Sequence, residues 1–373
     1  MTRQIIIISI LTFFIIFIFL PVNKIFAQDR INVRDFGAKG NGIKDDSEAI
    51  QTAINEISAT GGTVFLPPGV YKMKKGIEVP VGVNILGETN ATTGPWQNYL
   101  DSQDKNLHHD YQQMRNAGSE WLQFDMYKGT WILVDHGKGD VNSLPTFKLS
   151  GNTSIKKIGF VHKGLPPATE KMEQYPPAIG VYSNLETPAS REGVTIEDIS
   201  LANPYIGIVF AIGDDLNNYY QDKKANDVAR SLGRHRIHNV MGGPLYRGIM
   251  LKGLLDTVDI ANIQFNYSNY ESGYVVDRTQ QAVDIEIARA DGINLSNILS
   301  FGANKGLVTK PAFVNGTTSI RANNLNLEAR IPISLTSGQY EITNSYFLTL
   351  NPFGYVEEGE FNGLKVETNS DTV

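Results

Sequence analysis

The feature that most constrains the fold of this chain is an internal repeat with a period of 41 residues. Apolar segments at residues 195–199 and 207–210 recur at residues 236–240 and 248–251, with every apolar position kept in register. Each segment is too short to bury its own apolar face, so neighbouring repeats must stack against one another. The repeat therefore predicts a solenoid whose successive coils lie side by side.

The segments within the repeats have the character of short β-strands. They are rich in Ile, Val and Leu and are separated by Gly, Asn and Asp turns, a pattern typical of β-helix coils. We predict an all-β, single-stranded, right-handed parallel β-helix with coils over about residues 130–365 and loop insertions at residues 88–128, 163–177 and 214–234, where a binding cleft can be built. A β-sandwich is the alternative, but it does not explain the 41-residue register.

A short helix is expected before these coils. Asp45 and Glu48 have the spacing of a capping box, and the apolar period that follows predicts a helix from Asp45 to the glycine pair at residues 61–62. Strands and a Pro-Pro-Gly turn follow up to residue 87.

The order of motifs in this block carries a resemblance. The run Asp-Phe-Gly-Ala-Lys-Gly at residues 35–40 precedes the Asp-Asp-Ser helix start, then Gly-Gly-Thr-Val and Leu-Pro-Pro-Gly-Val-Tyr. Residues 31–87 resemble the N-terminal signature of the pectate-lyase superfamily of β-helix proteins, a group related to glycoside hydrolase family 28. The resemblance implies that this block caps the solenoid and supplies its first coils, but it implies little about chemistry.

The first residues are typical of an export signal. Arg3 provides a positive start, residues 5–20 are apolar, and Phe-Ala-Gln at residues 26–28 offers a cleavage point. We expect residues 1–27 to be a signal peptide and residues 28–373 to be one secreted or periplasmic β-helix domain, without stable membrane insertion after cleavage. An uncleaved anchor is the alternative, although the apolar run is shorter than the roughly 20 residues that span a bilayer.

Composition excludes several kinds of function. A net charge of −6 with 33 basic residues argues against nucleic acid, whose binding needs clustered Lys and Arg. The absence of cysteine excludes disulfides, thiolate metal sites and a cysteine nucleophile. The same charge repels polyanions, so an acidic substrate would need a local basic patch. Nothing in the sequence decides between a monomer and a homotrimer.

Three aspartates are the predicted catalytic residues. The 41-residue register places Asp215 on Asp256, with Asp214 beside them. Neighbouring strands lie about 4.8 Å apart, so such carboxylates can divide acid and base work on a glycosidic bond. The alternative is that Asp214 and Asp215 form a polar turn after a strand.

A resemblance supports this prediction in part. Gly-Asp-Asp at residues 213–215 resembles the element of glycoside hydrolase family 28 in which paired aspartates act as acid and base. That family's Asn-Thr-Asp, Gly-His-Gly and Arg-Ile-Lys motifs have no counterpart in this chain. Hydrolysis is therefore not carried over as a firm expectation.

A second set of residues suits elimination. Lyases of this fold resemble one another in using an Arg or Lys as base, with calcium held by carboxylates. Arg247, Lys252, Arg234, Arg236 and Asp256 fall on consecutive coils, and we predict that Arg247 and Lys252 bind or activate the substrate. Calcium is expected only if the reaction is an elimination. The alternative is that these charges are solvated and inert.

Further substrate contacts are predicted from residue type. His238 and Arg236 lie in a basic segment and could bind a uronate or tune a proton transfer. Trp96 and Tyr219 lie in the insertions and could stack on sugar rings. A surface histidine at a coil corner and aromatics that pin loops to the solenoid are the respective alternatives.

These features together predict a secreted carbohydrate-active enzyme that cleaves an acidic, uronate-containing, pectin-like polysaccharide by hydrolysis or β-elimination. The alternative from another class is a non-catalytic β-helix that binds glycans at the cell surface or in an exopolysaccharide system. A phage tailspike carries the same N-terminal block, but an export signal argues against that assignment.

Overall fold

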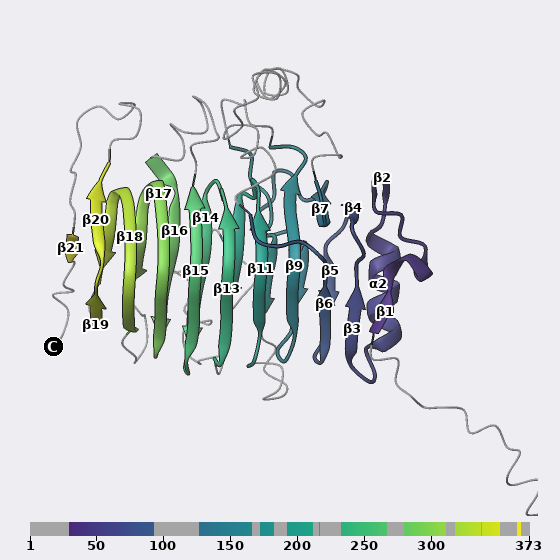
Figure 1. Ribbon diagram of the computed structural model, residues 1–373, viewed down its shortest axis with the longest axis horizontal. Coiled ribbons are helices and arrows are strands. Elements are labelled where there is room, and N and C mark those ends of the chain that lie inside the picture. The colour runs from purple at the N-terminus through teal and green to yellow at the C-terminus, as the bar shows by residue number, and fades with distance from the viewer. Residues whose placement is uncertain are drawn as a thin grey trace, which may run out of the picture.

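The computed structural model describes residues 30–92, 127–165, 172–182, 192–211, 216, 233–266, 280–310, 318–336, 338–350 and 364–366. The strands run parallel and stack along one long axis, from β1 and the helix α2 at one end to β19, β20 and β21 at the other (Figure 1). No helix in these ranges is long and apolar enough to cross a membrane. The predicted signal peptide lies outside them.

The helical elements are a 3-10 turn, η1 (Val33–Phe36), and α2 (Ser47–Ile57). The strands are β1 (Arg30–Asn32), β2 (Asn41–Asp45), β3 (Gly62–Phe65), β4 (Gly69–Met73), β5 (Ile77–Val79), β6 (Val83–Leu86), β7 (Thr130–Val134), β8 (Phe147–Leu149), β9 (Ser154–His162), β10 (Ile179–Tyr182), β11 (Thr195–Leu201), β12 (Ile206–Ala211), β13 (His235–Gly242), β14 (Arg247–Leu254), β15 (Val258–Asn266), β16 (Val283–Ala290), β17 (Ile293–Lys310), β18 (Thr318–Leu335), β19 (Gly338–Thr343), β20 (Tyr346–Thr349) and β21 (Leu364–Val366).

The strands form three parallel stacks. The first stack contains β1, β3, β6, the N-terminal parts of β9, β11, β13, β15, β17 and β18, and β19. The second contains β2, β4, β7, the following parts of those long strands, and β20. The third contains β5, β8, β10, β12, β14, β16, the ends of β17 and β18, and β21. The chain is therefore an all-β parallel β-helix, as predicted.

The 41-residue register is confirmed as the stacking of neighbouring coils. Thr195 pairs with Arg236 in the first stack, and Ile208 pairs with Ile249 in the third. The pairing of Arg30 with Thr63 places the first strands of the N-terminal block in the same stacks as the coils after residue 130. The coils therefore begin within the N-terminal block.

The N-terminal aspartates act differently from the expected capping box. Asp45 ends β2, and its carboxylate accepts hydrogen bonds from the backbone N–H and the hydroxyl of Ser47. Asp46 is the N-cap residue of α2, but its carboxylate accepts the backbone N–H groups of Lys39 and Gly40 instead. The predicted helix start at Asp45 and end at residues 61–62 are therefore wrong, since both aspartates fasten loops and α2 spans Ser47–Ile57.

The core consists of aliphatic side chains stacked from coil to coil. In the third stack, Ile208, Ile249, Ile285, Leu307 and Ile333 occupy one continuous row, and each is at most 1% exposed. Full burial of each such side chain stabilises the fold by about 1.5–3 kcal/mol. At the N-terminal end, α2 covers this core with its own buried apolar face.

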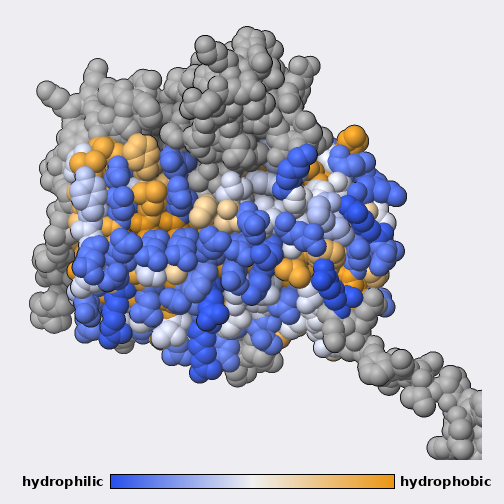
Figure 2. Space-filling model, in the orientation of Figure 1, coloured by the Kyte–Doolittle hydropathy of each residue, from blue (hydrophilic) through white to orange (hydrophobic). Residues whose placement is uncertain are grey.

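A ladder of left-handed residues forms the corner between the first and second stacks. Its members are Lys157, Asp198, Asn239, Asn262, Asn297, Asn324 and Asn344, each with φ between 49° and 59°. Asparagine tolerates this region better than most residues because its short side chain bonds locally. Neighbouring coils are joined by Asn324 donating to Asn297 and Asn297 donating to Asn262. Hydrophilic side chains run across this face of the coils (Figure 2).

Candidate functional site

A buried glutamate lies on the outer surface of the third stack. Ile285 and Ile287 of β16 belong to the core, and side chains alternate along a strand, so Glu286 points to the outer side. Glu286 is nevertheless 1% exposed, and it lies in register with Met250 of β14. Glutamate is almost never fully buried unless it is paired, so a partner is expected.

Arg247 of β14 is that partner. Its Nε lies 3.4 Å from Oε2 of Glu286, one coil away, and its side chain is 14% exposed. Its Nη1 donates hydrogen bonds to the carbonyl oxygens of Tyr246 and Gln281. Since backbone carbonyls hold the guanidinium, its position relative to Glu286 is fixed.

Two tyrosines support this pair from the corner before β14. The rings of Tyr205 and Tyr246 are stacked, with centroids 4.8 Å apart and planes 11° from parallel. The guanidinium carbon of Arg247 lies 3.8 Å from the centroid of the Tyr246 ring. This cation–π contact adds a further attraction that favours the observed position of Arg247. The 41-residue repeat of these tyrosines was visible in the sequence, but their stacking was not predicted.

More cations occupy the same stack. Lys252 of β14 pairs with Ala288 of β16, which pairs with Lys310 of β17. In the same way, Arg247 of β14 pairs with Val283 of β16, which pairs with Lys305 of β17. We call Arg247, Lys252, Lys305 and Lys310 the basic strip. The strip crosses β14 and β17 on either side of Glu286, within a chain whose net charge is −6. The strip supplies the local positive charge that an acidic substrate requires, with Lys305 and Lys310 half-buried, Arg247 14% exposed and Lys252 3% exposed.

Arg247 and Lys252, two of the predicted substrate-binding residues, thus lie on one strand beside Glu286. Sequence reasoning missed Glu286 itself. The available signal was a glutamate placed between two isoleucines in residues 283–290, where strand alternation puts it opposite the core face.

Asp256 lies in a different place. It follows the end of β14, at the corner between the third and first stacks, whereas Arg247 begins that strand. The extended part of β14 from Arg247 to Lys252 spans roughly 17 Å, and the chain then turns at Gly253, which has a φ of 69°, before it reaches Asp256. The side chain of Asp256 is 48% exposed, with Oδ2 at 3.9 Å from Nε of Arg234. Asp256 and Arg247 therefore do not form one cluster.

Four predicted site residues, Asp214, Asp215, Tyr219 and Trp96, lie outside the described residues. The register that supports the pairing of Asp215 with Asp256 is observed as far as Phe210 and Leu251. Catalysis by these aspartates stays a prediction.

His238 and Arg236 lie on the outer face of the first stack. Nε2 of His238 is 2.8 Å from Oδ2 of Asp259, and the His238 side chain is partly exposed. Arg236 is exposed and lies in register with Asp259. Both residues belong to another stack than Arg247 and Lys252, so the structure separates the predicted substrate-binding residues into two groups.

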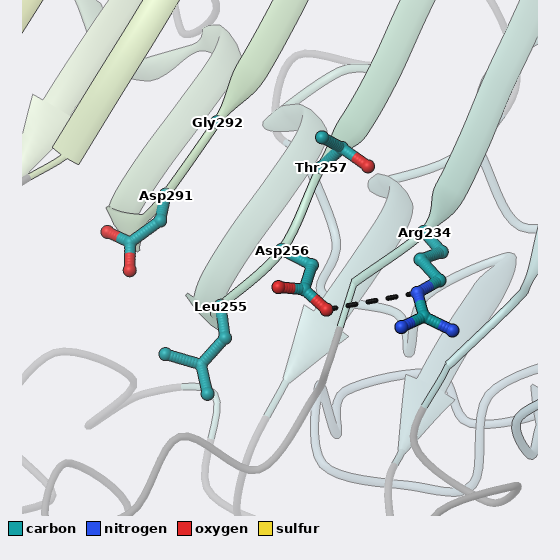
Figure 3. Close-up of a pocket in the computed structure, with 6 residues that line it drawn as sticks. All are labelled: Arg234, Leu255, Asp256, Thr257, Asp291 and Gly292. Carbon is teal, nitrogen blue, oxygen red and sulfur yellow. Dashed lines mark ion pairs between the residues drawn. The ribbon is translucent and has the colours of Figure 1, made fainter.

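A surface pocket of about 460 Å³ surrounds Asp256. We call it the corner pocket, and it is lined by Arg234, Leu255, Asp256, Thr257, Asp291 and Gly292. Asp256 lies between Arg234 and Asp291, and its carboxylate faces the guanidinium (Figure 3). Nη1 of Arg234 also lies 3.1 Å from Oε2 of Glu192, on the preceding coil. Within the described ranges, no group of three or more carboxylates and imidazoles is arranged to hold a metal ion.

Comparison with known families agrees with this architecture. The model of a family described as rhamnogalacturonase A/epimerase, pectate lyase-like, matches residues 30–133. That range contains the capping helix and the first coils, which belong to the same continuous solenoid as the later coils. The chain is a parallel β-helix protein whose N-terminal block is similar to this pectate-lyase-like family.

Individual relatives match this β-helix protein over short segments. Alginate lyase 7 of Azotobacter vinelandii is 52% identical over 56 residues, which is 15% of this chain and 6% of the relative. Mannuronan C5-epimerase AlgE6 of the same organism is 58% identical over 43 residues, or 11% of this chain and 5% of the relative. The matched segments thus span a small part of these relatives. The solved A-module of AlgE6 aligns at 14% identity and a TM-score of 0.38, covering 84% of this chain and 77% of the module.

Proposed function

We propose that this β-helix protein is a carbohydrate-active enzyme that binds a uronate-containing polysaccharide along the outer face of the third stack. The observation that carries the proposal is the basic strip around the buried pair of Arg247 and Glu286. A guanidinium presents a planar fork of donors that matches a carboxylate, and lysine adds compact positive charge. Successive uronates of a polymer could therefore pair with successive cations of the strip.

The charge arrangement fits removal of a proton from the carbon next to a uronate carboxylate. Arg247 or Lys252 would neutralise that carboxylate and stabilise the negative charge that develops when the proton leaves. Glu286, one coil from Arg247, would accept or return a proton at this carbon. Loss of the group on the neighbouring carbon then gives β-elimination, and return of the proton to the other face gives epimerisation.

Hydrolysis is the less favoured reaction. It requires two carboxylates that flank the scissile bond, at separations of about 5–9.5 Å. Asp256 is at the far end of β14 from Glu286's partner Arg247, so the second carboxylate would have to come from Asp214 or Asp215. Two matched relatives are named as an alginate lyase and a C5-epimerase, and both names agree with proton removal beside a carboxylate.

A non-catalytic glycan-binding protein is the second candidate. The observation that favours it is the enclosure of the pair: Nη1 of Arg247 already bonds two carbonyl oxygens, and Glu286 is 1% exposed. A pair so enclosed can serve as a rigid support for the neighbouring cations. In that case secretion and polysaccharide binding would remain, without turnover.

The proposal is tested by incubating the purified protein with polygalacturonate, alginate and rhamnogalacturonan, with and without calcium. Ultraviolet absorbance of an unsaturated uronate reports elimination, new reducing ends without that absorbance report hydrolysis, and proton NMR of the polymer reports epimerisation. Glu286→Gln should abolish turnover, whereas Glu341→Gln, an exposed glutamate paired with Arg321, should keep it. Binding without turnover in the wild-type protein would support the second candidate.

A further inference from the structure

The backbone of Arg234 is unusual for its residue type. Arg234 has a φ of 57°, in the left-handed region that a bulky side chain rarely occupies. The strand register places it at the same corner position of its coil as four glycines and one asparagine, namely Gly61, Gly82, Asn152, Gly193 and Gly292. All five have φ between 51° and 82°. Thr257 occupies this position on the next coil without a left-handed φ, so Arg234 is a long cationic side chain at a left-handed corner position that glycine or asparagine fills on these five other coils.

The contacts of Arg234 aim this side chain at the corner pocket. Its guanidinium lies between Oε2 of Glu192, at 3.1 Å, and Oδ2 of Asp256, at 3.9 Å, while its side chain stays 66% exposed. Gly233, before it, allows close packing, because a Cβ there would come within 2.7 Å of the Asp256 backbone. The arginine is therefore held in a defined direction and remains accessible to a ligand.

The charges around the pocket restrict what it can bind. Glu192, Asp256 and Asp291 lie on three different coils around the single guanidinium of Arg234, so the formal charge of these four groups is negative. This balance repels a uronate. A divalent cation is also disfavoured, since Asp256 faces the positive guanidinium (Figure 3).

A neutral ligand rich in hydroxyl groups suits this arrangement. Sugar hydroxyls can donate to carboxylates and accept from a guanidinium, and such charge-assisted hydrogen bonds are stronger than neutral ones. Thr257 adds an exposed hydroxyl, and half-buried Leu255 adds an apolar wall. A few directed polar groups beside an apolar surface are characteristic of small-ligand sites.

We infer that the corner pocket is a binding subsite for a neutral sugar residue, with Arg234 and Asp256 as its main hydrogen-bonding groups. The pocket follows the end of β14, the strand that also carries Arg247 and Lys252 of the basic strip. This inference deepens the proposed function and rests on it for the nature of the polymer. It names the substrate class as a heteropolysaccharide that carries both uronates and neutral sugars.

The test is binding of defined oligosaccharides to the full chain, measured by calorimetry or ligand-observed NMR. The probes are neutral galacto- and rhamno-oligosaccharides, oligogalacturonates, and calcium chloride alone. Arg234→Gly removes the guanidinium while glycine accepts the same φ, so the fold should be kept. We expect Arg234→Gly and Asp256→Asn each to weaken neutral-sugar binding about tenfold or more, the loss of one to two good hydrogen bonds. Arg321→Ala, which removes an exposed arginine paired with Glu341, should leave this binding unchanged.

The outcomes separate this inference from the proposed function. Glu286→Gln should abolish turnover of a uronate polymer yet preserve neutral-sugar binding, because the pocket and the basic strip are different surfaces. If Glu286→Gln loses turnover but the wild type does not bind neutral sugars, the subsite is overturned and the proposed function stands. Equal binding by wild type and Arg234→Gly, or binding of calcium without any sugar, would also overturn it.

Discussion

Arg247 and Glu286 form an ion pair across neighbouring coils, with 3.4 Å between Nε and Oε2, and Glu286 is almost completely excluded from solvent. Removing one member of a buried pair leaves the other charge desolvated without its partner. We expect Arg247→Met to lower the free energy of unfolding by about 3 kcal/mol or more. Equilibrium denaturation in guanidinium chloride measures this loss.

The double variant Arg247→Met, Glu286→Leu provides the matched control. It removes both charges and replaces them with apolar groups of similar size, so it should recover most of the stability that Arg247→Met loses. If the double variant is as unstable as the single one, packing of the arginine rather than charge pairing explains the effect.

Acid should destabilise the protein through the buried histidines His162 and His235 and the half-buried His136. Burial lowers the pKa of His136 to about 4 and the pKa values of His162 and His235 to about 3, from 6.5 for the free side chain. Below pH 6.5 the unfolded chain takes up protons that the folded chain does not. Each histidine therefore removes up to about 1.4 kcal/mol of stability per pH unit as the pH falls from 6.5 towards these lower values.

Denaturant midpoints measured between pH 7 and pH 4.5 check this prediction. The midpoints should fall steadily below pH 6.5, and the decrease of the midpoint per pH unit should be smaller for His162→Leu than for the wild type. Identical slopes for the two proteins would show that His162 does not take part in the linkage.

His162→Leu should also stabilise the protein at pH 7.5. Both ring nitrogens of His162 are buried without a hydrogen-bond partner, and the ring packs edge-on against Tyr175. Replacing an unsatisfied polar group with an apolar one of similar volume removes a desolvation cost of about 1–3 kcal/mol. A thermal midpoint below that of the wild type would mean that the imidazole is better accommodated than these contacts indicate.

The asparagine ladder should contribute measurably to stability. Asn297 has a φ of 53°, accepts from Asn324 and donates to Asn262. Asn297→Ala loses both hydrogen bonds and places a Cβ residue in the left-handed region, so we expect a loss of about 2–3 kcal/mol. Asn297→Gly avoids the backbone cost and should lose less, which separates the two terms in chemical denaturation. Equal losses would mean that the backbone contributes nothing.

The sequence predicted the solenoid because coil stacking leaves a direct trace in residue spacing. Thr195 and Arg236 occupy equivalent positions in successive coils of equal length, and this equality made the register visible. Other coils differ in length through their loops, so the pairing of Arg236 with Asp259 could not be read in the same way. The role of Asp45 was also mistaken, because an aspartate that hydrogen-bonds a loop before a helix lies as close to the helix start in the sequence as one that caps the helix.

The candidate site was predicted in part. Arg247 and Lys252 were chosen for their charge and their place in one repeat, and both lie on the third stack. Glu286 was missed because its flanking isoleucines make the strand look like ordinary core. Asp256 was grouped with Arg247 because these charges fall on consecutive coils, but charge and spacing do not reveal that most of β14 separates the two residues.

The central claim is that the third stack binds and transforms a uronate polymer beside Glu286. The most direct test is the initial rate of unsaturated-uronate formation, or of C5 inversion by NMR, for wild type and Glu286→Gln on polygalacturonate and alginate at equal folded fraction. The account predicts turnover by the wild type on at least one uronate polymer and a loss of about a hundredfold or more in the variant, as expected for a group that transfers the proton. Turnover that survives unchanged in Glu286→Gln would contradict it.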